Sequence, residues 1–290
     1  MTTRSRLKGA RFFVPMLRAS RRIRRQLAES EEVVRWASVV TGPTEFWTVT
    51  VWQTRHDMQE FMRSGAHEAI MWQFSRWLTS FWLMRWRPGP WELGTWRGRS
   101  IAQPERDDEG RESAGPRPPN EALDRALEHL PWLKAATGPD GAACYESTGN
   151  ARRRRAEVGG AGGAMICVSG RPWRTLAMRR ALTRIRHQAA GDADFLRAAL
   201  GFGPPGEVYL MALWKTRDGA RRLLSSPELA AVAGRWSGWA NEWLPENEFG
   251  HWDGLRLRRA KGRHAIPVPE AAMRSARTDH DEAPTDHEPR

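Results

Sequence analysis

His67 is the residue of this sequence best suited to chemistry. It follows Ser64 and Gly65, where we expect a new helical segment to begin, and helical spacing places it beside Phe74 on the edge of an apolar stripe. A neutral imidazole that borders an apolar cavity could act as a catalytic base or bind the iron of a haem. A surface or helix-capping histidine would show the same spacing, so both interpretations stay open. His251, in a glycine-containing turn, is a second candidate, for which an ordinary exposed histidine is the favoured interpretation.

Two arginines, Arg35 and Arg55, each recur 162 residues later in the chain. An arginine beside a cavity could pair with a carboxylate, such as a propionate of haem, and these two are the candidates for that role. A repeated arginine is equally typical of an ion pair that stabilises the fold, here with Glu45 or Glu207. We prefer this second interpretation.

The recurrence belongs to a tandem duplication. When the sequence is shifted by 162 residues, 35–77 aligns with 197–239 without a gap. Identical residues across the copies are Arg35 and Arg197, Ala37 and Ala199, Pro43 and Pro205, Glu45 and Glu207, Trp52 and Trp214, Thr54 and Thr216, Arg55 and Arg217, Ser64 and Ser226, Ala69 and Ala231, Ser75 and Ser237, and Trp77 and Trp239. A Gly-x-Trp-x-Gly turn recurs as well, at 94–98 and 250–254. The two copies should therefore share one fold.

Each copy predicts the element order β-α-β-β-α-β. For the first copy we expect strands at 11–17, 33–40, 44–54 and 81–86, a helix from Ser20 to about Glu29, and a second, broken helix that ends near Ser80. For the second copy we expect strands at 165–169, 195–202, 208–216 and near Phe249, a helix at 173–189, and a helix broken at Ser226 and Pro227. This order is that of a ferredoxin-like unit, an α+β fold in which both helices cover one face of an antiparallel sheet.

The third strand of each copy has apolar side chains on both of its faces. We assign Trp47, Val49, Val51, Tyr209, Met211 and Leu213 to the helix-covered face. The opposite face then carries Phe46, Thr48, Thr50 and Trp52 in one copy and Val208, Leu210, Ala212 and Trp214 in the other. Large apolar side chains do not face water, so the two sheets should pack face to face as an intrachain pseudo-dimeric α/β barrel. The predicted substrate pocket inside it is lined by Thr48, Thr50, Trp52, Phe74 and Trp214.

Composition changes along the chain divide it into four parts. Residues 1–98 form repeat 1 and 163–260 form repeat 2. Between them, 99–162 is a linker rich in Pro, Gly and charge, with one amphipathic helix expected at 120–135. The charged residues 261–290 are expected to be a disordered tail.

Composition also excludes several classes of protein. The net charge of +12 comes from 42 arginines and 4 lysines that are spread along the chain, so we expect no specific binding to nucleic acid. Two cysteines rule out a disulfide framework, and no apolar run approaches the length of a membrane span. A Ser-His-Asp order, an HExxH motif, a phosphate-binding loop and a dinucleotide fingerprint are all missing from the sequence. We expect a cytoplasmic monomer or weak homo-oligomer.

These residues resemble a family of oxygenases. The stretch 194–254, with its Gly-Phe-Gly-Pro-Pro-Gly loop, a strand ending in Trp214 and the 250–254 turn, is similar to the spheroidene monooxygenases and, more loosely, to antibiotic-biosynthesis monooxygenases with dimeric α/β barrels. The resemblance implies oxygen insertion into an apolar substrate, with haem as a candidate cofactor held by His67. The second copy has Leu229 in place of His67, so at most one pocket should be active.

Two functions of different classes follow from this pattern. The first is a monooxygenase-like enzyme that oxidises a small or elongated apolar molecule in the barrel of the first copy. The second is a non-catalytic small-molecule-binding or scaffold protein of the same fold. A haem absorption band in the pure protein would favour the first; a colourless protein would leave cofactor-free oxygenation or binding.

Overall fold

The structure is a computed structural model that describes residues 1–62, 64–71, 77–103, 133–137, 143–147 and 161–250, with Trp252, Leu255 and Leu257. Most of the expected linker helix, the expected tail at 261–290, Phe74 and His251 lie outside these residues. The last residues of the expected linker helix, 133–135, belong instead to a hairpin formed by β5 (Leu133–Thr137) and β6 (Ala143–Ser147). No helix among the described residues has the length and apolar composition to cross a bilayer.

The two repeats have matching elements in matching order. Repeat 1 contains β1 (Thr2–Leu7), α1 (Phe13–Glu29), β2 (Val33–Gly42), β3 (Glu45–Trp52), α2 (Arg55–Met62), α3 (Gly65–Met71) and β4 (Leu78–Gly94). Repeat 2 contains β7 (Gly162–Ser169), α6 (Thr175–Ala190), β8 (Phe195–Phe202), β9 (Glu207–Trp214), α7 (Arg217–Leu224), α8 (Pro227–Arg235) and β10 (Ser237–Gly250). Short 3-10 helices precede α1 (Ala10–Phe12) and α6 (Pro172–Arg174).

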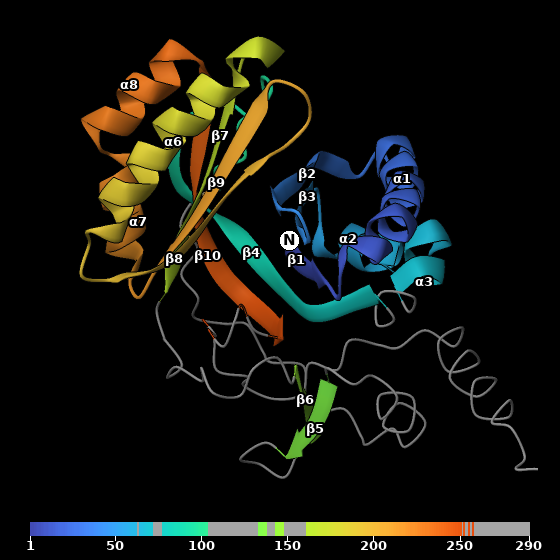
Figure 1. The fold of residues 1–290 in the computed structure, drawn as a ribbon. Helices are drawn as coiled ribbons and strands as arrows, with labels where there is room; N and C mark the ends of the chain where they lie inside the picture. Colours follow the sequence, from blue (N-terminus) through green and yellow to red (C-terminus); the bar gives the residue numbers. More distant parts are fainter. Residues whose placement is uncertain are drawn as a thin grey trace, which may run out of the picture.

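Eight strands close into one barrel in the order β1-β3-β2-β8-β9-β7-β10-β4. Each repeat therefore supplies a four-stranded ferredoxin-like sheet, and the sheets join along two seams. The long strands β4 and β10 pair from Gly94 and Trp239 to Trp82 and Gly250, whereas β2 and β8 pair through Val40 and Phe202. Helices α1–α3 and α6–α8 lie on opposite sides of the strands (Figure 1). The predicted intrachain α/β barrel is confirmed.

The predicted assignment of the strand faces is wrong. Trp47, Met211 and the residues alternating with them belong to a core cluster that contains no helix residue and fills the barrel interior. Leu210 and Trp214 instead pack with side chains of α6 and α7, and Phe46 packs with side chains of α1 and α3. Both faces of the third strand are apolar, so alternation alone could not tell them apart. The set that includes Trp47 and Tyr209 faces the barrel interior, and the other set faces the helices.

The first strand is also misplaced by the sequence pattern. Residues 11–17 form the 3-10 turn and the start of α1, and Ser20 lies inside that helix. Pro15 is tolerated in a first helical turn, where its missing N–H is not needed. The actual strand is β1, which was missed because its inward-facing residues include a charged one, Arg4, that is completely buried. The final strands β4 and β10 run far longer than expected.

Candidate functional site

The structure places His67 in the helix layer outside the barrel. Its backbone N–H donates to Oε1 of Gln26 over 2.9 Å, and its Nδ1 donates to the carbonyl of Met62 over 3.1 Å. Its ring lies 5.2 Å from that of Phe61 in α2. Burial lowers the pKa of His67 to about 4, against the opposing effect of the Met62 carbonyl, so the ring is neutral at pH 7. The predicted orientation of His67 towards the barrel interior is wrong.

Two of the predicted pocket residues do meet near His67, on the helix side of the sheet. Trp52 donates from Nε1 to Thr50 Oγ1 over 2.8 Å, and its ring lies 4.8 Å from Phe61. Thr48 alternates with Thr50 on the same face of β3. Thr48, Thr50 and Trp52 share one face of β3, as expected, but this face is on the helix side of the sheet and not inside the barrel.

Trp214, the equivalent of Trp52 in repeat 2, also lies on the helix side of the sheet. It is buried between the sheet and the helices, 6.0 Å from the ring of Phe195 and directly over Gly219 of α7. The predicted pocket therefore does not form inside the barrel from the residues that the structure describes.

The repeated arginines hold backbone turns. Arg35 donates from Nε to the carbonyl of Trp96 over 3.0 Å and from Nη2 to that of Arg97 over 2.9 Å. Arg197 donates to the carbonyl of Trp252 in the matching turn. For Arg35 the preferred interpretation, an ion pair with Glu45 or Glu207, is wrong, because its acceptors are carbonyls.

The other repeated pair is not equivalent. Arg55 is exposed at the start of α2, whereas Arg217 pairs with Glu242 over 3.1 Å. Both arginines are the first residues of helices in the outer layer, α2 and α7.

Each turn inserts its tryptophan into an end of the barrel against the other repeat. Trp96 stacks on Trp239 at 4.7 Å between ring centres, with the rings 17° from parallel. Trp252 meets Trp47 edge-on at 4.6 Å. The two plugged ends are related by the pseudo-twofold symmetry of the repeats. Repeated Arg35 and Arg197 are explained by this shared construction.

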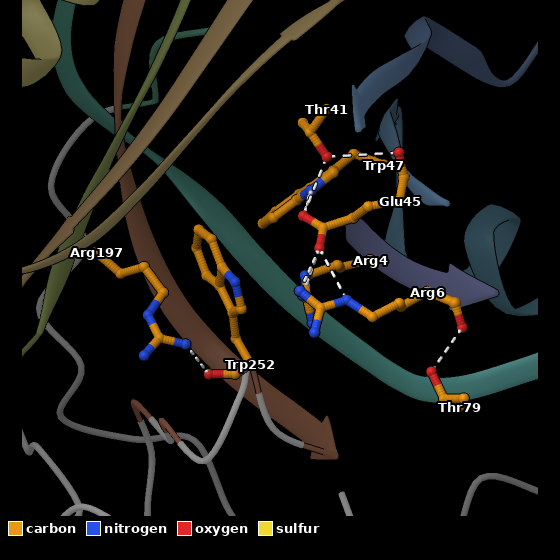
Figure 2. Close-up of polar contacts among 8 residues, drawn as sticks. All are labelled: Arg4, Arg6, Thr41, Glu45, Trp47, Thr79, Arg197 and Trp252. Atoms are coloured by element: carbon orange, nitrogen blue, oxygen red, sulfur yellow. Dashed lines mark hydrogen bonds and ion pairs between the residues drawn. The ribbon is translucent and has the colours of Figure 1, made fainter. Parts of the chain in front are cut away.

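The barrel end formed by repeat 1 is an arginine-glutamate cluster (Figure 2). Glu45 accepts from Arg4 at 2.5 Å, Arg6 at 2.9 Å and Thr41 Oγ1 at 3.0 Å. Burial alone would raise the pKa of Glu45, but the hydrogen bonds and charge of Arg4 and the hydrogen bond of Arg6 outweigh it and lower the pKa to about 2. The carboxylate of Glu45 at this end is therefore already paired with Arg4 and Arg6.

The ring of Trp252 lies between two guanidinium groups at the same end (Figure 2). The Arg4 group is 5.9 Å and the Arg197 group 5.6 Å from the ring centre. Such contacts between cations and an aromatic face help to hold the tryptophan in place.

The barrel end formed by repeat 2 has different chemistry on the same framework. Glu207 accepts two parallel hydrogen bonds from Arg97, both 2.8 Å, and a third from the Tyr209 hydroxyl over 2.6 Å. Trp96 Nε1 donates to that hydroxyl over 3.3 Å. Cys167 is paired directly opposite Tyr209. By register, Cys167 and Tyr209 stand where repeat 1 has a charged Arg4 and Trp47.

Burial keeps the Cys167 thiol and the Tyr209 hydroxyl protonated at the barrel end of repeat 2. It raises the pKa of the Cys167 thiol to about 12, with the charge of Glu207 acting in the same direction. Burial likewise raises the pKa of Tyr209, with further contributions from Cys167 and Glu207. Both groups are protonated at neutral pH. The Glu207 end therefore offers a neutral hydroxyl and a carboxylate in contact, an arrangement that can pass a proton.

A small cavity lies in the barrel interior next to Tyr209. Its walls are Val39, Thr41, Trp47, Val49, Met165, Ala199, Tyr209 and Met211, and it has room for about one water molecule. Seven tryptophans are part of the surrounding core. A haem does not fit this space, and His67 lies outside it. The residues described also contain no group of three or more His, Cys, Asp or Glu side chains that could hold a metal ion.

Sequence reasoning missed Arg97, Cys167 and Tyr209 as a site. One signal was available, since the duplication aligns Glu45 with Glu207 and Trp47 with Tyr209 at the start of the third strand. The approach of Arg97 from the other repeat could not be read from spacing, because it depends on the closed barrel.

No family model and no curated protein matches this chain. Among solved structures, a protein of Fusobacterium nucleatum with a provisional assignment as a monooxygenase matches at 8% identity and a TM-score of 0.30, over 86% of this chain and 92% of its own. One of Lactobacillus acidophilus with the same provisional assignment matches at 7% identity and a TM-score of 0.31, over 86% of this chain and 94% of its own. The chain is an intrachain dimeric α/β barrel.

Matches to single repeats include oxygenases too. SnoaB of Streptomyces nogalater, a cofactor-independent oxygenase, matches at 16% identity and a TM-score of 0.24, over 37% of this chain and 96% of its own. The looser of the two resemblances, to antibiotic-biosynthesis monooxygenases, is found again among solved structures: a protein of Nitrosomonas europaea provisionally assigned to that group matches at 15% identity and a TM-score of 0.24, over 30% of this chain and 83% of its own.

Proposed function

We propose that this barrel binds a small apolar molecule beside Tyr209 and oxidises it with O2, as a monooxygenase-like enzyme. The observation that supports this is the Tyr209–Glu207 contact of 2.6 Å at the wall of an apolar cavity. The proposal places the site in the half of the barrel formed by repeat 2, in contrast to the sequence-based expectation for repeat 1. It uses no haem.

A carbon acid is the substrate class that such a site would serve. A methylene group flanked by a carbonyl or a phenol ring can lose a proton to the Tyr209 oxygen while the Tyr209 proton moves to Glu207. The carbanion reduces O2, a C–O bond forms, and loss of water leaves a ketone. In balance, the methylene compound and one molecule of dioxygen give the ketone and one molecule of water. The substrate therefore supplies all four electrons, and no external reductant is required.

Arg97 and the apolar walls of the cavity would determine how readily this proton transfer occurs. Arg97 binds both oxygens of Glu207 and so holds the carboxyl group with one oxygen facing the tyrosine. The apolar walls exclude water, which would otherwise protonate the carbanion. Admission of a substrate requires the barrel to open at the short β2–β8 seam, which borders the cavity through Val39 and Ala199.

A second candidate function is non-catalytic binding. It is favoured by the seven tryptophans that fill the core around the small cavity, because they leave little room for a substrate. In that case the barrel would bind ligands through tryptophan rings without turning them over.

The two functions are separated by turnover. Anthrone serves as a probe because its methylene is acidified by the ketone across the ring system. The pure protein should consume O2 and form the quinone, with one atom of labelled oxygen in the product when 18O2 is supplied. Tyr209→Phe should lower kcat by about 100-fold or more, a typical contribution of acid-base catalysis.

Thr41→Val is the matched control, because Thr41 is the other hydroxyl-bearing residue of the cavity wall. Its kcat should fall far less than that of Tyr209→Phe, because Thr41 donates to Glu45 and not to Glu207. Tryptophan quenching by anthrone without O2 uptake would favour the binding function. Equal rates for the wild-type protein and Tyr209→Phe would refute the proton relay.

A further inference from the structure

The outer surface of the barrel carries an unusual group of exposed apolar side chains. Of the seven large ones exposed in the described part of the chain, six belong to β2, β8 and the starts of the helices α1 and α6. We call these six the outer apolar patch: Phe13, Val14, Val40, Trp173, Leu176 and Phe202. The seventh, Trp91, lies on β4.

Strand pairing and ring contacts connect the α1 side of the patch to the seam between the repeats. Val40 and Phe202 are paired with each other at that seam. Val40 is paired on its other side with Phe46, whose ring lies 5.7 Å from that of Phe13 at the start of α1. Val14 follows Phe13 and is half exposed. Apolar surface therefore runs from the seam to the first turn of α1.

The α6 side continues from the same seam. The guanidinium of Arg179 lies over the ring of Phe202 at 5.6 Å. Leu176 is one helical turn before Arg179 and shares its face of α6. Trp173, just before α6, is 72% exposed and has the Arg171 guanidinium 5.2 Å from its ring. The patch thus spans both repeats, with α1 and α6 flanking the strands (Figure 1).

The surroundings of the patch are strongly basic. Residues 8–28 contain six arginines and no acidic residue, and residues 170–191 also contain six arginines and no acidic residue. Exposed arginines of these two segments are Arg11, Arg18, Arg21, Arg22, Arg25, Arg171, Arg174, Arg179, Arg180 and Arg184. A partner of this face must therefore be apolar at its centre and negatively charged around it.

We propose that this face is a docking surface for an anionic lipid bilayer. Exposed Trp, Leu and Phe side chains insert between lipid headgroups, and the surrounding arginines contact the negative charge of the headgroups. Nucleic acid would satisfy the arginines but not the aliphatic part of the patch. No patch residue lines the cavity, so vesicle binding is measured separately from turnover in the barrel.

Vesicle sedimentation of the full chain tests the proposal. The protein should bind vesicles of phosphatidylcholine mixed with phosphatidylglycerol, bind those of phosphatidylcholine alone far more weakly, and lose most of its binding at high salt. Trp173→Ser combined with Leu176→Ser should weaken binding by roughly tenfold or more, because burial of even one large apolar side chain is of that order. Arg174→Gln with Arg180→Gln should also weaken it, by roughly fivefold for each arginine that reaches the headgroups.

Trp91→Ser is the matched control, because Trp91 is 45% exposed and also has an arginine, Arg221, 5.9 Å from its ring. It should bind like the wild-type protein. Circular dichroism and melting curves should show each variant folded, because the substituted positions are exposed. Equal loss in Trp91→Ser and Trp173→Ser, equal binding to neutral vesicles, or binding to duplex DNA in the absence of vesicle binding would each overturn the proposal.

Discussion

Replacement of His67 by leucine should reverse the order of stability between neutral and acidic pH. Repeat 2 has a completely buried leucine, Leu229, at the matching position, so the substitution suits the fold. At pH 8 the His67→Leu variant loses the hydrogen bond from Nδ1 to the Met62 carbonyl, which is 3.1 Å long. It should then be less stable than the wild-type protein by about 1 kcal/mol.

The expected loss of folding stability at acidic pH follows from the lowered pKa of His67. The pKa falls from 6.5 in the unfolded chain to about 4 in the folded protein, chiefly by burial. The unfolded state therefore binds more protons below pH 6.5, and the folded state loses stability as the pH falls from 6.5 towards 4. A shift of this size corresponds to about 3 kcal/mol when complete, and to about 2.5 kcal/mol at pH 4.5. The leucine variant has no such loss, so it should be the more stable protein at pH 4.5.

Urea unfolding followed by tryptophan fluorescence at several pH values between 8 and 4.5 measures the difference directly. His56→Gln is the control, because it removes an exposed histidine from the same repeat. A constant difference in free energy of unfolding between His67→Leu and the wild-type protein across this range would refute the burial of a neutral imidazole.

Three further predictions concern the barrel ends. Gly94→Ala should destabilise the protein far more than Gly98→Ala, as measured by thermal melting. Both glycines have positive φ. A Cβ at Gly94 would overlap the backbone oxygen of Gly238, whereas a Cβ at Gly98 would meet open space. Trp96→Ala should lower the free energy of unfolding by about 3–5 kcal/mol, as expected for a buried tryptophan, and the half-exposed Trp91→Ala by much less. Because its pKa is lowered to about 2, Glu45 stabilises the fold above pH 4.5 and this contribution, up to about 3 kcal/mol, is lost as the pH falls to 2; acid unfolding of Glu45→Gln should show a shallower loss.

The duplication made the architecture predictable. Ungapped matches such as Trp52 with Trp214 required one fold for both copies, and two apolar faces on one strand required the sheets to face each other. The same apolar character hid which face was which, because alternation marks a face only when one side is polar. Strand β1 was hidden for a related reason, since Arg4 is an arginine in a completely buried position.

The candidate site was less accessible from the sequence, because it is assembled by the closure of the barrel. Trp96 and Arg97 come from repeat 1 but contact Tyr209 and Glu207 of repeat 2, more than a hundred residues away. Spacing along the chain carries no information about such a contact. His67 stood out because its local helical spacing is visible in the sequence. The sequence did not show that its helix lies outside the barrel.

A comparison of the two barrel ends shows which positions the fold requires. Both ends keep a glutamate at the start of the third strand and a tryptophan turn held by an arginine. The position opposite the third strand differs: a buried guanidinium at Arg4 in one repeat and a neutral thiol at Cys167 in the other. Loss of Arg4 would leave Glu45 as a poorly compensated buried charge, so that end is constrained by stability. At the other end the compensating charge for Glu207 comes from Arg97 of repeat 1. Tyr209 and Cys167 can therefore differ from their counterparts Trp47 and Arg4. This end of the barrel can accommodate chemistry while the barrel stays closed.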